Sequence, residues 1–161
     1  MSALLVAGLL TTPTAPAGAA PAPECTNTHL TASYRVTGGG MSHEYGRIVL
    51  RNVSDTACTI RGYGGLSFVG GGDGTQIGAA ATRTPSKVRS ILVRPGQRVV
   101  SDLSATSAAP YPRRRCRPAH VDGFRVYLPD ETRAQYVPHP TAGCRNRRVH
   151  LLEHKAFRRP R

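Results

Sequence analysis

The stretch "NVSDTACTIRGYGGLSF", residues 52–68, decides the fold class of this chain. It places a polar turn, Ser54-Asp55, directly before a β-rich run that starts at Cys58. A cysteine at the first position of a strand can face inward and reach another strand. The Gly-Tyr-Gly-Gly that follows permits a sharp turn, because glycine adopts positive φ angles at little cost. The stretch therefore predicts short strands joined by tight turns, with Tyr63 half-buried at their edge.

Short β-rich runs recur on both sides of this stretch, about ten residues apart, with Asp73-Gly74 and Pro95-Gly96 as turn signals between them. No long helical period interrupts the runs. This spacing predicts an all-β fold, an antiparallel β-sandwich of about seven to nine short strands. The predicted strands are residues 30–36, 45–53, 58–63, 66–70, 86–93, 98–105, 123–129, 134–138 and 148–154.

The N-terminal residues differ in composition from the rest. Residues 3–10 form an apolar run that is followed by proline, small residues and an Ala17-Gly18-Ala19 cleavage motif, although no Lys or Arg precedes the run. This layout predicts a secretory signal peptide over residues 1–20 and a short linker at 21–24. The run is far shorter than the ~20 apolar residues of a membrane-spanning helix. We therefore expect a secreted protein without a transmembrane segment.

Four cysteines occur, at positions 25, 58, 116 and 144. An even count in a small exported chain predicts a disulfide framework, with three possible pairings. No two cysteines have C-x-x-C spacing and the six histidines are scattered singly, so the pattern does not favour a metal site.

The order of these features resembles the DUF4232 family, an actinobacterial exported domain of unknown function. An early cysteine is followed by "RIVLRNVSDTACTIRGYGGLSFV", by Asp-Gly, by "ILVRPGQRVVSDLSA" and by a late cysteine pair. Ile60 and Gly64 depart from the family pattern. The positions that match it are Asn52, Cys58, Thr59, Gly62, Tyr63, Gly65, Val93, Pro95 and Gly96.

The resemblance covers residues 25–152 and leaves a basic C-terminal tail at 153–161. It implies an exported, immunoglobulin-like β-sandwich with the disulfides Cys25–Cys58 and Cys116–Cys144. It implies no activity, because none is assigned to the family.

Motifs of enzyme chemistry are missing from the sequence. No Gly-x-Ser-x-Gly elbow occurs, and the glycine-rich turn lacks the lysine of a phosphate-binding loop. Ser42, His43 and Glu44 are adjacent on a strand and would point to alternating faces, whereas a triad needs side chains that converge. His120 and Asp122 could share a face, but no nucleophile is marked beside them. We therefore expect a non-enzymatic protein without catalytic, metal or cofactor-binding residues.

The chain is strongly basic, with 22 Lys and Arg residues, 9 Asp and Glu residues and a net charge of +13. Arginines flank both late cysteines and would gather in one place if these cysteines pair, because bridged Cα atoms lie about 5.5–6 Å apart. Arginine suits bidentate phosphate contacts. The candidate anion-binding residues are Arg113, Arg114, Arg115, Arg117, Arg145, Arg147 and Arg148.

These observations predict an exported binding or cell-envelope module whose arginines dock anionic wall polymer or another envelope protein. Nucleic acid is not favoured, because only Tyr111 offers a ring for base stacking beside the arginines. One alternative is a solvated basic face without a ligand. Another is a protease inhibitor that presents arginine on a rigid, extended loop, residues 110–116, beside a disulfide. The pattern does not indicate an oligomeric state.

Overall fold

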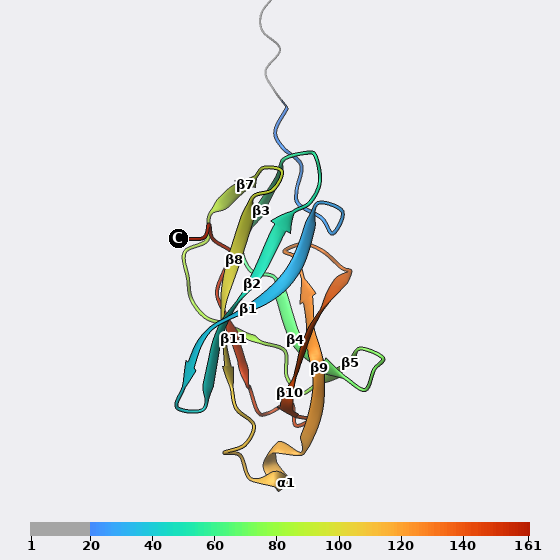
Figure 1. The fold of residues 1–161 in the computed structure, drawn as a ribbon, viewed down its shortest axis with the longest axis vertical. Coiled ribbons are helices and arrows are strands. Elements are labelled where there is room, and N and C mark those ends of the chain that lie inside the picture. The colour runs from blue at the N-terminus through green and yellow to red at the C-terminus, as the bar shows by residue number, and fades with distance from the viewer. Residues whose placement is uncertain (1–19) are drawn as a thin grey trace, which may run out of the picture.

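A computed structural model describes residues 20–161 as a mostly β fold with eleven strands, three open sheets and one short helix (Figure 1). The predicted signal peptide lies outside this range, except for its last residue. Within the range, no helix is long and apolar enough to cross a membrane. The elements are β1 (Leu30–Gly40), β2 (His43–Asn52), β3 (Cys58–Arg61), β4 (Gly65–Gly70), β5 (Thr75–Ile77), β6 (Thr82–Arg83), β7 (Ser90–Val93), β8 (Arg98–Thr106), α1 (Arg113–Cys116), β9 (Pro118–Tyr127), β10 (Ala134–Cys144) and β11 (Leu152–His154).

The strands form one sheet in the order β1-β2-β8-β11-β6, a second in the order β10-β9-β4-β5, and a small third sheet of β3 and β7. Neighbouring strands are antiparallel except β11 and β6, which are parallel. In Figure 1 the two large sheets lie alongside each other, with β3 and β7 at the top and α1 at the bottom. We call these two regions the upper end and the lower end.

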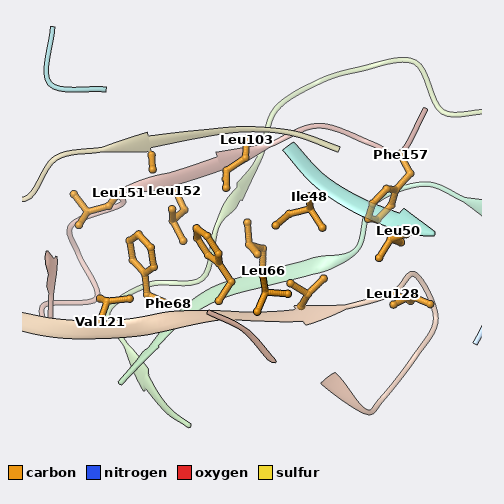
Figure 2. Close-up of a cluster of buried hydrophobic side chains, with 14 of the residues drawn as sticks. Ile48, Leu50, Leu66, Phe68, Leu103, Val121, Leu128, Leu151, Leu152 and Phe157 are labelled. Atoms are coloured by element: carbon orange, nitrogen blue, oxygen red, sulfur yellow. The ribbon is translucent and has the colours of Figure 1, made fainter. Parts of the chain in front are cut away.

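The core lies between the two large sheets, because alternate residues of each strand point inward. On β2, Ile48 and Leu50 are buried while their neighbours face outward. Figure 2 shows these side chains gathered with Leu66 and Phe68 of β4 and Val121 of β9. Full burial of each such side chain contributes about 1.5–3 kcal/mol to the free energy of unfolding.

Each predicted run overlaps a strand, but the sequence pattern missed β5, β6 and α1. It also missed the extension of β10 to Cys144, because Pro138 and Pro140 argue against a regular strand. A register shift between Pro138 and Thr141 accommodates the prolines, so that pairing with β9 resumes beyond them. The turn predicted at Asp73-Gly74 is present and joins β4 to β5.

The chain beyond residue 152 is not the separate basic tail that we expected at 153–161. Its first residues belong to β11, which pairs with β8. Phe157 is 3 % exposed and lies in the core, as Figure 2 shows. The main chains of Arg158 and Val100 exchange two hydrogen bonds. The charge of the segment suggested a solvated tail, but one buried phenyl ring and this pairing hold it against the sheets.

Candidate functional site

Both disulfides that the resemblance implied are present. Cys116 and Cys144 are buried and bonded, with Cα atoms 4.6 Å apart, and this bond joins the end of α1 to the end of β10 at the lower end. Cys25 and Cys58 are bonded in the same way at the upper end, and Cys58 opens β3 with its side chain inward. The four sulfurs are therefore unavailable as thiolate nucleophiles.

Helix α1 shapes the chain on one side of the lower disulfide. Pro112 stands before it and accepts a hydrogen bond from the N–H of Cys116, and the fixed φ of proline suits a helix start. Arg117 adopts a left-handed φ of 53° and donates its N–H to the carbonyl of Arg113, which ends the helix. The extended loop over residues 110–116 that the protease-inhibitor alternative requires is therefore wrong, because residues 113–116 make a helical turn before the chain enters β9.

Asn146 connects the two arginine segments across the disulfide. Its side-chain amide donates to the carbonyl of Arg115 at 2.7 Å, and its main-chain N–H donates to the carbonyl of Cys116 at 3.2 Å. Its side-chain oxygen accepts from the N–H of Arg148 at 3.0 Å. The sequence analysis did not single out Asn146. The available signal was the tendency of asparagine to hydrogen-bond the main chain two residues on.

The structure brings all of the predicted arginines to the lower end, and every one of them is exposed. We call this group the arginine cap. None of its members lies within 4.0 Å of a carboxylate of the described residues. The guanidinium of Arg115 lies over the ring of Tyr111, 6.0 Å from its centroid. The cap thus carries positive charge that nearby acids do not balance, and such a surface attracts anions. The arginine cap consists of Arg113, Arg114, Arg115, Arg117, Arg145, Arg147 and Arg148.

An open groove of about 700 Å³ lies beside the cap, and Arg145 forms part of its wall. His120 and Asp122 share this groove, as their spacing predicted, with Nε2 and Oδ1 3.4 Å apart. Asp122 also accepts a hydrogen bond from the N–H of Gly72 at 2.8 Å. With Asp73 on the same wall, the groove contains two carboxylates, so the unbalanced positive charge lies on the cap and not in the groove.

A second polar group, which the sequence analysis missed, lies where β1 and β10 approach each other. Glu44 accepts a hydrogen bond from the hydroxyl of Tyr34 at 2.7 Å and lies 3.1 Å from Nε2 of His139. Burial, followed by the hydrogen bond to Glu44, raises the pKa of Tyr34 above its ordinary value. His43 lies near Thr106 instead, with Nδ1 and Oγ1 3.3 Å apart. The adjacent Ser-His-Glu segment therefore does not converge as a triad.

The contacts of Glu44 with His139 and of His43 with Thr106 join strands that are distant in the sequence, so no local pattern predicts them. Among residues 20–161, no three His, Cys, Asp or Glu side chains are grouped so that they could hold a metal ion.

No curated protein and no solved structure matches the chain. The sequence profile of the family described as "Domain of unknown function (DUF4232)" matches residues 25–157. This range contains both disulfides, and it extends past the predicted boundary at 152 to the buried Phe157. The chain therefore belongs to the DUF4232 family.

Proposed function

We propose that this protein is an exported, non-enzymatic binding module that docks onto anionic polymers of the cell envelope through the arginine cap. The observation that carries the proposal is the gathering of seven exposed arginines, without a carboxylate within 4.0 Å among the described residues, around one disulfide. Two disulfides agree with an oxidising compartment outside the cytoplasm. An immunoglobulin-like arrangement of the two large sheets is part of the same proposal.

The composition of the cap favours phosphate-bearing polymers. A guanidinium group is planar, stays charged at any physiological pH and offers a fork of donors that matches phosphate oxygens. The disulfide and the Asn146 hydrogen bonds hold the two arginine segments side by side before any ligand arrives. Less conformational entropy is then lost on binding than if the two segments were free.

The test compares two triple variants that each remove three positive charges. The cap variant is Arg113→Ala, Arg114→Ala and Arg115→Ala. The control variant is Arg61→Ala, Arg89→Ala and Arg133→Ala, which are also exposed. Binding to purified, phosphate-rich wall polymer is measured at two salt concentrations.

We expect the cap variant to lose affinity about tenfold or more and to show a smaller salt dependence, because fewer counterions are released on binding. The control variant should stay within about a factor of three of the parent. Equal losses in the two variants, or binding of the parent protein that ignores salt, would contradict the proposal. If an envelope protein is the partner instead, a pull-down from envelope extract will retain it at high salt.

The alternative function, protease inhibition by a presented arginine, has less support. Extended peptides are held through their main chain when they add to a sheet edge, and the helical turn of α1 does not offer this conformation. Incubation with trypsin tests it. Rapid cleavage after Arg114 without loss of trypsin activity would exclude an inhibitor.

A further inference from the structure

A second set of arginines lies on the outward face of the first sheet, apart from the arginine cap. The alternation of β2 turns Arg47, Val49 and Arg51 away from the core. Arg35 of β1 and Arg98 of β8 stand beside them on the neighbouring strands. A groove of about 500 Å³ crosses this face. In Figure 1 the strands of this face, β1, β2 and β8, lie above α1.

The arginines of this face stand in directly opposed pairs. Arg35 is the register partner of Arg47, and Arg51 is the register partner of Arg98. Directly opposite residues in an antiparallel pair have Cβ atoms about 4.5–5.5 Å apart, and like charges there are destabilising. Because Arg35, Arg51 and Arg98 are exposed, packing does not require arginine at these positions. The face therefore carries a repulsion that an anion would relieve.

Asp102 of β8, the register partner of Arg47, is already engaged. Asp102 contacts Nε of Arg47 at 3.0 Å and Nη2 of Arg158 at 2.7 Å. No Asp or Glu of the described residues lines the groove itself, whereas Pro160 and Arg161 of the C-terminal segment do. The pair formed by Arg51 and Arg98 thus lacks a carboxylate within 4.0 Å among the described residues.

The pairing of the arginines favours phosphate over carboxylate. One guanidinium fork can occupy both coplanar oxygens of a carboxylate, whereas a phosphate group presents oxygens in several directions. Two guanidinium groups from opposed strands can therefore contact the same phosphate.

Between the two pairs the floor of the groove is uncharged. Ser33, Val49 and Val100 lie across the three strands in one row of the register. Arg47 and Arg51 are four residues apart on β2, which at about 3.3 Å per residue separates the two pairs by about 13 Å.

We propose that this groove binds a linear chain that carries two phosphate groups about 13 Å apart, joined by an uncharged segment. One phosphate lies at the Arg35–Arg47 pair and the other at the Arg51–Arg98 pair, while the linker crosses Val49. The proposal does not depend on the function of the arginine cap.

The probe is an alkane chain with a phosphate at each end, of a length that sets the phosphates about 13 Å apart. The reference compound is the same alkane with one phosphate. Both are titrated into the mature protein, and binding is followed by chemical-shift changes. The groove variant is Arg51→Ala with Arg98→Ala. The matched control is Arg89→Ala with Arg133→Ala, and the cap variant is the triple variant described above.

We expect the bisphosphate to bind at least about tenfold more tightly than the monophosphate, because its second contact is intramolecular. The groove variant should abolish this difference, while the control and cap variants keep it. Since removal of Arg51 and Arg98 relieves a like-charge pair, the melting temperature of the groove variant at low salt should be equal to or above that of the parent.

Three results would overturn the proposal. The parent protein could bind the bisphosphate and the monophosphate equally tightly. The matched control could lose the preference for the bisphosphate as fully as the groove variant does, or only the cap variant could lose it. A parallel titration with a dicarboxylate of the same length tests the preference for phosphate. Equal or tighter binding of the dicarboxylate would refute that preference.

Discussion

The upper and lower ends of the molecule are each closed by a disulfide, which spans 33 residues at the upper end and 28 at the lower end. The residues that surround the two disulfides are of different kinds. At the upper end the N–H of Phe157 donates to the carbonyl of Gly62, and the ring enters the core. At the lower end the disulfide is covered by a four-residue helix, by Asn146 and by exposed arginines.

This difference teaches how the two ends are stabilised. The upper end depends on apolar burial in addition to its disulfide. At the lower end Ala119 and Val149 are also buried, but the α1 turn and the arginine segments are held mainly by the disulfide and a few hydrogen bonds, mostly from main-chain groups. Because these do not require particular side chains on the surface, the lower end can carry many like charges that would be costly in a packed region.

The largest expected effect tests the apolar half of this comparison. Phe157→Ala should lower the free energy of unfolding by about 3–5 kcal/mol, because it empties a buried site. Tyr111→Ala removes the half-buried ring of the lower end and should cost only about 1 kcal/mol. Urea denaturation measures both. Equal costs would mean that the two ends are held in the same way.

The disulfides themselves provide the next comparison. Replacement of either cysteine pair by alanine should cost about 3–4 kcal/mol, because the two closed loops are of similar length. Binding of wall polymer by the folded protein should decrease only when Cys116 and Cys144 are replaced, since this bond holds the arginine segments together. If loss of the Cys25–Cys58 bond weakened polymer binding equally, the lower disulfide would have no special part in binding.

The buried His154 should make the stability of the fold depend on pH. Burial, followed by the positive charge of Arg83, lowers the pKa of His154 to about 4, from an ordinary value of 6.5. Between pH 6.5 and about 4, His154 is therefore protonated in the unfolded chain but neutral in the folded protein. The free energy of unfolding should decrease as the pH falls through this range and level off below about pH 4.

The free energy of unfolding should decrease by up to about 3 kcal/mol between pH 6.5 and about 4. His154→Gln should flatten the melting temperature between these pH values. His150→Gln, at an exposed position, is measured beside it as the matched substitution. A flat profile for the parent protein would contradict the prediction.

The smallest expected effect concerns the connection within the lower end. Asn146→Ala should lower the free energy of unfolding by about 1 kcal/mol, since it removes side-chain hydrogen bonds to the Arg115 carbonyl and the Arg148 N–H. It should also weaken binding of wall polymer slightly, although no charge is lost. Unchanged affinity would show that the arrangement of the cap matters less than its charge.

Features that depend on local sequence were predictable, whereas features that depend on strand register were not. The β-rich run at residues 45–53 predicted a strand, and in the structure Arg47 and Arg51 lie on one face of β2. The run did not reveal that Arg35 and Arg98 would stand opposite them, because register joins residues that are distant in the sequence.

The site shows the same limit. The sequence marked the arginines of the cap by their position next to two cysteines, and the family resemblance supplied the pairing that brings them together. The contacts of Glu44 with Tyr34 and His139 join three strands and left no local signal. At the C-terminal segment, charge was a misleading guide, because the main-chain pairing of Arg158 and the burial of Phe157 outweigh it.

Each disulfide joins cysteines that are consecutive along the chain, the first with the second and the third with the fourth. A chain that enters an oxidising compartment from its N-terminus exposes Cys25 and Cys58 before Cys116 arrives. The native partner is then the next cysteine to appear, and the second bond can form without opening the first. Correct oxidation would thus need an electron acceptor but no thiol–disulfide reshuffling, a process that takes seconds to hours.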